Sequence, residues 1–237
     1  MKKKNKILCT ICARIGSKGV KNKNFKLING KPLILYTVEQ AIKSKIFDVI
    51  IISTDNTKIK EIININNKSI LFRKRPKHLA DDKSSKIDVI KDALSFAEES
   101  LKYEFNTIMD LDVTCPLRNL VDIKKSLNKF VNKKSNVLFS VCESNKNPYF
   151  NIVEKKKNSI QLVINSRKIF KSRQKAPKTF DINGAVYLFK RSVLKKLKTQ
   201  YGNKTDIYVM PQDRSIDIDT NNDWKMVNYF LKNADII

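Results

Sequence analysis

The alternation of short apolar segments with amphipathic ones over residues 7–141 is the feature that most constrains this fold. The apolar segments lie at 7–13, 47–55, 69–72, 106–112 and 137–141, and the amphipathic ones at 33–42, 57–65, 86–101 and 121–131. Short β-branched runs are typical of buried strands, whereas apolar residues every three or four positions are typical of helices. The pattern predicts an α/β fold with a mostly parallel sheet and helices on both faces, and 237 residues suit a single domain over 1–237.

Residues 145–180 depart from this alternation. Strand-like segments at 149–153 and 160–164 flank a Lys-rich turn, which predicts a hairpin that protrudes from the main layers and can pack on a second subunit. The chain then returns to the sheet at 183–189 and 207–210, with a helix expected at 191–197. A strand ending in a helix cap is expected at 215–220, before an amphipathic closing helix that contains Trp224 and Phe230.

A loop rich in Gly, Lys and Arg follows the first predicted strand, at residues 14–24. Gly16 and Gly19 allow sharp turns and close approach of the backbone to a ligand. Backbone N–H groups in such a loop can surround an anion, and Arg14, Lys18 and Lys23 offer charge-assisted hydrogen bonds to phosphate oxygens. The loop predicts a phosphate-binding site, with a solvated basic turn as the alternative. It matches neither the P-loop pattern nor the dinucleotide-binding glycine pattern.

Carboxylates occur at alternate positions of two other predicted strands. Asp110 and Asp112 would face one side of the strand at 106–112, and Asp217 and Asp219 would do the same at 215–220. Asp217 and Asp219 would suit a hard divalent ion such as Mg²⁺, whose other ligands are commonly waters and phosphates. For these two residues a helix N-cap is the alternative. Because ligands bind at the carboxyl ends of parallel strands, the cationic loop should meet Asp112, Asp217 and Asp219 there. The combination predicts nucleotidyl transfer.

The formal net charge of +25 permits attraction to nucleic acid, anionic lipid or polyphosphate ligands. Lys, Asn and Ile are abundant throughout, so a general residue bias is the alternative. No apolar run is long enough to span a membrane, and Arg14 interrupts the signal-like N-terminus, so we expect a cytoplasmic protein. Cys9 and Cys12 would point to opposite faces of a strand, and Cys115 and Cys142 have no partner spacing, so four buried, reduced thiols are expected. His78 is expected in a loop.

Short motifs spread along the chain carry a family resemblance. They are Ala13-Arg14-Ile15-Gly16-Ser17-Lys18-Gly19, Lys23-Asn24, Gly30-Lys31-Pro32-Leu33, Ser53-Thr54-Asp55, Arg75-Pro76, Thr114-x-Pro116-Leu117-Arg118, Asn183-Gly184-Ala185 and Ser215-Ile216-Asp217-Ile218-Asp219-Thr220. In this order, over nearly the whole chain, they resemble the acylneuraminate cytidylyltransferases, or CMP-sialic acid synthetases. The resemblance implies a Rossmann-like nucleotide-diphospho-sugar transferase fold and a homodimer. It also implies that CTP and a nonulosonic (sialic-type) acid give a CMP-sugar and pyrophosphate, with Mg²⁺ as cofactor.

The resemblance also implies roles for particular residues. Those implied for nucleotide binding are Arg14, Gly16, Ser17, Lys18, Gly19, Lys23, Asn24, Arg75 and Ser85. Among these, Arg14, Lys18 and Lys23 are implied as catalytic residues that stabilise the leaving group. The residues implied for sugar binding are Asp112, Arg118, Arg173 and Asn183, and those implied for the metal are Asp217 and Asp219.

One motif departs from the family pattern. Sialic acid enzymes resemble Gln-Pro-Thr-Ser-Pro-Leu-Arg where this chain has Asp112-Val113-Thr114-Cys115-Pro116-Leu117-Arg118. A carboxylate lacks the donor of an amide, and the Asp form resembles the branch that handles legionaminic acid and related bacterial sugars. A second metal carboxylate, as in the related Kdo cytidylyltransferases, is the alternative for Asp112. The alternatives for the whole chain are a transferase for another nucleotide or sugar, and a basic nucleic-acid-binding protein whose affinity falls steeply with salt.

Overall fold

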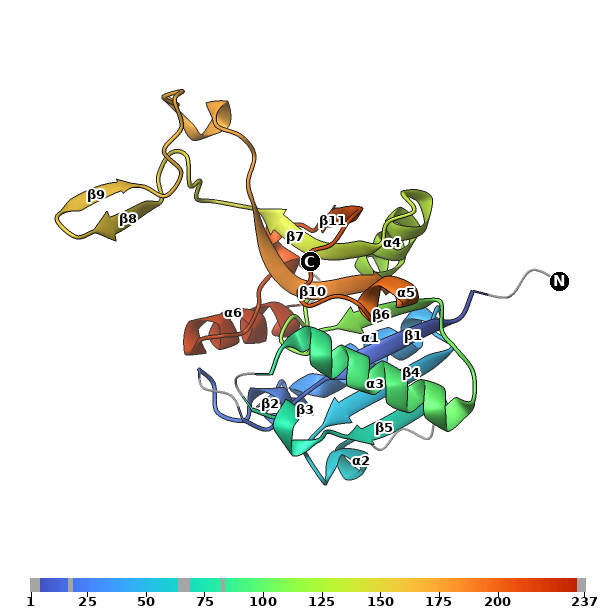
Figure 1. Cartoon of the computed structure of the whole chain (residues 1–237). Helices are drawn as coiled ribbons and strands as arrows, with labels where there is room; N and C mark the ends of the chain where they lie inside the picture. The colour runs from blue at the N-terminus through green and yellow to red at the C-terminus, as the bar shows by residue number, and fades with distance from the viewer. Residues whose placement is uncertain (1–4, 17–18, 64–68, 82–83, 234–237) are drawn as a thin grey trace.

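A seven-stranded sheet forms the centre of the computed structural model, which describes residues 5–16, 19–63, 69–81 and 84–233 (Figure 1). In spatial order its strands are β11 (Thr205–Val209), β7 (Val137–Glu143), β10 (Phe180–Lys190), β6 (Thr107–Leu111), β1 (Ile7–Cys12), β4 (Val49–Thr54) and β5 (Ile70–Lys74). Strand β10 is antiparallel to β6 and β7, and the other pairings of this sheet are parallel. The prediction of a mostly parallel sheet is confirmed.

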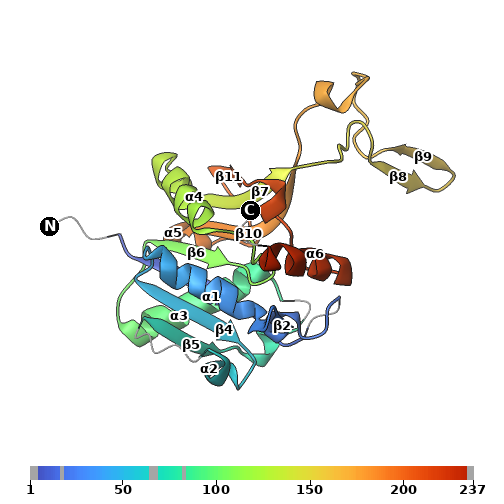
Figure 2. The same cartoon turned by 180° about the vertical axis from the view of Figure 1, so that it is seen from behind.

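Helices cover both faces of the sheet, as predicted (Figure 1, Figure 2). Those packed on one face are α1 (Leu33–Ser44), α2 (Ile59–Ile62), α4 (Leu120–Asn132) and α6 (Asn221–Lys232), and those on the other are α3 (Lys86–Leu101) and α5 (Arg191–Leu194). Each face has its own apolar cluster because side chains alternate along a strand. In β1, for example, Leu8 packs beneath α3 whereas Cys9 and Ile11 pack beneath α1.

Residues 144–179, here called the arm, leave the sheet between β7 and β10 and extend away from the body (Figure 2). The predicted protruding hairpin is present within the arm, as β8 (Val153–Lys156) and β9 (Ser159–Leu162). Its strands lie closer to the turn than the predicted segments 149–153 and 160–164. The reason is a turn at Asn147, whose carbonyl oxygen accepts hydrogen bonds from the N–H groups of Phe150, Asn151 and Ile152.

The prediction of a strand at 215–220 is wrong. After β11 the chain turns at Pro211 and forms a short 3₁₀ helix at Gln212–Arg214, and residues 215–219 then run as a loop. The backbone N–H of Ile218 donates to the carbonyl of Thr114, 3.0 Å away, which ties this loop to the segment that follows β6. Asp217 and Asp219 therefore reach the sheet edge from a loop.

The strand registers bring several loops to one edge of the sheet. In the parallel pairs, Cys12 of β1 lies opposite Ser53 of β4, and Thr10 of β1 lies opposite Asp110 of β6. The loop after β1 leads into a small ribbon formed by β2 (Leu27–Ile28) and β3 (Lys31–Pro32), which precedes α1. In the described part of the chain, we find no helix with the length and apolar character needed to cross a bilayer.

Candidate active site

A cavity of about 550 Å³ lies at the carboxyl ends of β1, β5 and β6. The predicted site residues that line it are Arg14, Gly16, Gly19, Lys23, Asn24, Arg75, Asp112, Asp217 and Asp219. The cationic loop after β1 and the C-terminal carboxylates, about two hundred positions apart in the sequence, thus face one space. Ser17 and Lys18, also predicted for this site, lie outside the described residues.

The loop after β1 makes direct contact with the loop that carries the carboxylates. The Lys23 ammonium group donates hydrogen bonds to the carbonyl of Ile218 and to Oδ1 of Asp219, the latter at 2.9 Å. A Cβ atom on Gly19 would collide with the carbonyl oxygen of Asp219, so the close packing here requires glycine. Within the loop, Nδ2 of the buried Asn24 donates to the carbonyl of Arg14 at 2.9 Å.

The opposite wall of the cavity contains Arg75 and the start of α3. Arg75 is buried, and its guanidinium donates to the carbonyl of Ser53 at 2.8 Å, which fixes it against the end of β4. Ser85 is the N-cap of α3: its hydroxyl accepts from the N–H of Asp88 and donates to that residue's carboxylate. Ser84 and Lys86, on either side of this cap, line the cavity, whereas Ser85 is not among its lining residues.

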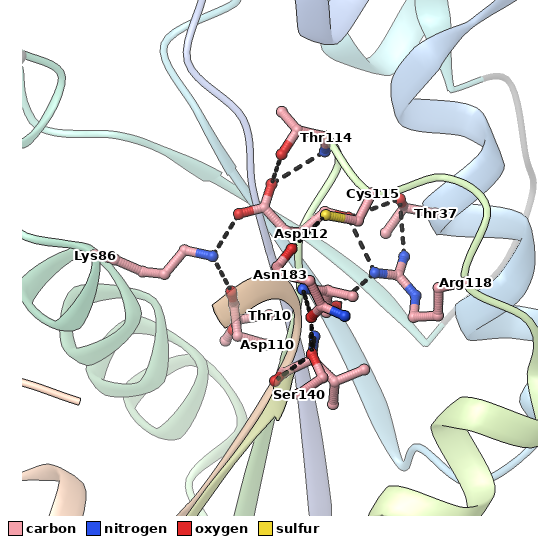
Figure 3. Close-up of polar contacts among 12 residues, drawn as sticks. Thr10, Thr37, Lys86, Asp110, Asp112, Thr114, Cys115, Arg118, Ser140 and Asn183 are labelled. Atoms are coloured by element: carbon pink, nitrogen blue, oxygen red, sulfur yellow. Dashed lines mark hydrogen bonds and ion pairs between the residues drawn. The ribbon is translucent and has the colours of Figure 1, made fainter. Parts of the chain in front are cut away.

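Asp112 is held from two sides, as Figure 3 shows. Its Oδ2 lies 2.5 Å from Nζ of Lys86, and its Oδ1 accepts from the N–H and the hydroxyl of Thr114 at 3.1 and 2.9 Å. Burial raises the pKa of Asp112, but these contacts outweigh it and lower the pKa to about 2. Burial likewise lowers the pKa of Lys86, and the charges of Asp112 and Asp110 more than offset it, so this pKa is raised well above its usual value. No motif in the sequence marks Lys86 as a site residue.

Asp217 is in the opposite situation. Its Oδ1 is buried and has no hydrogen-bond partner among the described residues. Burial first, and then the negative charge of Asp112, raise the pKa of Asp217 to about 6. A divalent cation would supply the missing partner and the missing positive charge, so Asp217, with Asp219 beside it, fits an oxygen-binding ion such as Mg²⁺. The described residues contain no cluster of three or more His, Cys, Asp or Glu side chains suited to a metal, so phosphates or waters would complete the coordination.

Two residues predicted to bind sugar lie beneath the cavity. Arg118 is fully buried, and its guanidinium donates to the carbonyls of Asp112 and Ala185 and to side chains of α1 (Figure 3). Asn183 is buried as well, donating to Ser215 Oγ at 2.9 Å and accepting from the Ser140 hydroxyl at 2.6 Å. In this structure both side chains connect the segments that carry the site.

Arg173, also predicted for the sugar, lies on the arm. It is exposed, and its guanidinium donates to the carbonyl of Asn145 at 2.9 Å. It lines a separate cavity at the base of the arm, together with Glu143 and Gln212.

The cysteines are free thiols, as predicted, and Cys9 and Cys12 belong to opposite faces of β1. The expectation that all four are buried is wrong for two of them. Cys12, which lines the cavity, and Cys142 are half-buried because each lies near the end of its strand. His78 is exposed in a short 3₁₀ helix at Lys77–Leu79.

Comparison with known proteins gives consistent matches over nearly the whole chain. A family model described as Cytidylyltransferase matches residues 8–234. The chain is 42% identical over 225 residues to the CMP-N,N'-diacetyllegionaminic acid synthase of Campylobacter jejuni, covering 95% of this chain and 94% of that protein. It is 39% identical over 232 residues to the post-translational flagellin modification protein B of Campylobacter coli, covering 98% of this chain and 97% of that protein.

A solved structure supports the fold. A CMP:2-keto-3-deoxy-manno-octonic acid synthetase complexed with CTP superposes with a TM-score of 0.65, over 97% of this chain and 99% of that one. The two sequences are 16% identical, so this likeness speaks for the fold alone.

Proposed function

Because this chain belongs to the cytidylyltransferase family, we propose that it activates a nonulosonic acid with CTP, giving a CMP-sugar and pyrophosphate. The observation that carries the proposal is the cavity in which the cationic loop and the C-terminal carboxylates face each other, joined by the contact of Lys23 with Asp219. The cations of the loop suit the β- and γ-phosphates, and the carboxylates beside them suit a divalent ion that these phosphates would share.

In the proposed reaction the anomeric hydroxyl oxygen of the sugar acid forms a bond to the α-phosphorus of CTP. The bond from that phosphorus to the bridging oxygen breaks, and pyrophosphate leaves in line. Arg14 and Lys23 line the cavity and would stabilise the charge that builds on the leaving group. Asp217 and Asp219 would hold Mg²⁺, which when bound neutralises phosphate charge. Most of the catalysis would come from positioning and charge stabilisation.

We further propose a legionaminic-type acid as the sugar substrate. Two observations support this choice: the relative named CMP-N,N'-diacetyllegionaminic acid synthase, and a carboxylate at Asp112 on the cavity wall. The homodimer and the cytoplasmic location expected from the sequence stay predictions.

A pyrophosphate-release assay tests the proposal across the four common NTPs and a panel of sialic, legionaminic, pseudaminic and Kdo acids. We expect turnover with CTP and a legionaminic acid, dependent on added Mg²⁺. Turnover with another NTP, or with Kdo alone, would reject the assignment of substrate class. No turnover with any pair would reject the activity itself.

A further inference from the structure

Lys86, the first residue of α3, lies between two carboxylates at the cavity. We propose that Lys86 is a positioning residue that occupies the Asp112 carboxylate, confining a divalent cation to Asp217 and Asp219 and leaving Asp112 to face the sugar. The inference rests on the proposed function and deepens it, because it divides the carboxylates of one site between metal and sugar.

The contacts of the Lys86 ammonium group are the first argument. Nζ lies 2.5 Å from Asp112 Oδ2, 3.2 Å from Asp110 Oδ2 and 4.5 Å from the centroid of the Tyr187 ring. The ammonium group donates a hydrogen bond to Asp112, and it forms an ion pair with Asp110 and a cation–π contact with the Tyr187 ring. Figure 3 shows Lys86 reaching from α3 to both carboxylates. These contacts hold the Lys86 ammonium group against the two carboxylates.

The contrast between Asp112 and Asp217 is the second argument. Both oxygens of Asp112 already have partners, from Lys86 on one side and Thr114 on the other. A metal ion that bound Asp112 would have to displace a charge-assisted hydrogen bond to Lys86. Asp217, by contrast, has a buried oxygen without a hydrogen-bond partner among the described residues. The cation should therefore go to Asp217. Asp219 can join it because only Oδ1 of Asp219 contacts a lysine, Lys23, and this side chain is largely exposed. The comparison argues against Asp112 as a second metal carboxylate.

The charge of the cavity is the third argument. Asp110 and Asp112 carry two negative charges and Lys86 carries one positive charge, so the three groups together have a net charge of −1. Without Lys86 they would have a net charge of −2 beside Asp217, in a site that must admit a triphosphate. A carboxylate has about four lone-pair positions, so Asp112 retains acceptor capacity for hydroxyl or amide N–H donors of a sugar acid.

Lys86→Met tests the inference in two measurements on the full chain. The first is Mn²⁺ binding without nucleotide, followed by the EPR signal of free Mn²⁺. We expect Lys86→Met to bind Mn²⁺ about tenfold more tightly, because a third carboxylate becomes available to the ion and affinity rises with ligand charge. The second is the pair of KM values: we expect the KM of the sugar acid to rise about tenfold and that of CTP by less than about threefold, since Asp112 is the one of the two contacted carboxylates that lines the cavity.

The control is Lys91→Met on the same helix. Lys91 is buried to a similar degree, but its ammonium donates to the carbonyl of Leu197, away from the cavity. We expect the Mn²⁺ affinity and both KM values of Lys91→Met to match those of the wild-type protein. If Lys86→Met stays within twofold of wild type in either Mn²⁺ affinity or the KM of the sugar acid, the inference is overturned.

A second variant covers the case in which Lys86→Met fails to fold because Asp110 is left buried without a cation. Lys86→Met combined with Asp110→Asn removes that charge, keeps an acceptor for the Thr10 hydroxyl, and leaves Asp112 without its lysine. Mn²⁺ affinity and the two KM values are then measured on this double variant, and the expected and contradicting results are those given for Lys86→Met. Absence of nucleotidyl transfer in the wild-type protein would reject the proposed function. If the wild-type protein is active and the Lys86 variants have the same Mn²⁺ affinity and KM values, this inference alone is rejected.

Discussion

Lys23 places its ammonium group directly against the loop that carries the carboxylates. We expect Lys23→Ala to lower kcat by on the order of a hundredfold, because removal of one donor that stabilises developing charge typically costs that much. Pyrophosphate release at saturating substrates measures the effect. Lys21→Ala, an exposed position of the same loop, is the matched control. Equal rates for wild type and Lys23→Ala would contradict the role given to Lys23.

Gly19 determines how closely the two loops can approach. In Gly19→Ala the new methyl group would meet the Asp219 carbonyl oxygen, a backbone atom that cannot rotate away. We expect a loss of turnover of at least tenfold with little change in thermal stability, because Gly19 is exposed and the displaced segment is a loop. In Gly16→Ala the nearest atom to the new methyl group is Nη1 of Arg14 at 3.7 Å, so a smaller loss is expected. A larger loss of turnover in Gly16→Ala than in Gly19→Ala would show that the contact between the two loops does not limit turnover.

Site residues can be predicted from the sequence where they form an unusual local pattern. A cationic loop after a strand and paired carboxylates predicted Lys23 and Asp219 for one site, and both line the cavity. Lys86 could not be predicted, because one lysine among 48 basic residues has no local signature and its importance comes from its contacts with Asp110 and Asp112. The burial of Arg118 could not be predicted from the sequence either. Arg118 fits the family motif, yet the structure places it beneath the cavity.

At the scale of elements, α4 is attached to the segment that precedes the carboxylate loop. Asp122, fully buried in the first turn of α4, accepts two hydrogen bonds from the Arg214 guanidinium at 3.0 and 3.1 Å. Arg214 lies just before the loop that carries Asp217. Burial first, and then the Asp122 charge and hydrogen bond, raise the pKa of the neighbouring Tyr208 to about 12. This network fixes the direction in which the loop approaches the cavity.

We expect Arg214→Met to lower the free energy of unfolding by about 3–5 kcal/mol, because it leaves the Asp122 carboxylate buried without its cation. Urea unfolding followed by circular dichroism measures the change. Lys129→Met is the control: its pair with Asp206 is 3.4 Å long and partly exposed, and such pairs contribute about 0–1 kcal/mol. Similar losses in the two variants would mean that the Arg214 pair is no stronger than a surface contact.

The contact between α3 and α5 predicts a dependence of stability on pH. Burial raises the pKa of Glu98, but hydrogen bonds from Arg191 and Phe105 and nearby positive charges outweigh it, so the pKa lies below its usual value. A lowered pKa in the folded state gives stability that is present above the unfolded pKa of about 4.3 and lost as the pH falls through the folded value. We expect Glu98→Gln to destabilise at pH 7 and much less near pH 3. A pH-independent difference in urea midpoints would contradict this.

Elements were predictable where a hydrophobic pattern alone determines them. The strands β1, β4 and β6 and the helices α1, α3 and α4 lie within a few residues of their predicted positions, because each buries an apolar face. The segment 215–219 alternates apolar and acidic residues like a strand, but it lacks an adjacent strand to pair with. Both edges of β6 are already paired, with β1 and β10, so the segment remains a loop. Which strands pair in a sheet depends on residues far apart in the sequence, so a local alternation of apolar and polar residues cannot predict it.

At the scale of the whole molecule, the arm exposes apolar side chains that its own hairpin does not cover. Ile160 and Ile169 are 72% and 89% exposed, and the arm extends away from the body (Figure 1). Exposed apolar side chains that gather on one projection mark a protein–protein contact. They are consistent with the homodimer expected from the sequence, with the arm in its interface.

We expect the wild-type protein to be a dimer, and the double variant Ile160→Lys with Ile169→Lys to be a monomer at micromolar concentration. Two lysines in an apolar interface would be desolvated without partners and would repel their copies. Size-exclusion chromatography with light scattering gives the mass directly. Leu27→Lys is the matched control, because Leu27 is 60% exposed in β2 of the body and should leave the dimer intact. A double variant that remains dimeric would place the interface elsewhere, and dissociation by Leu27→Lys would place it on the body near β2.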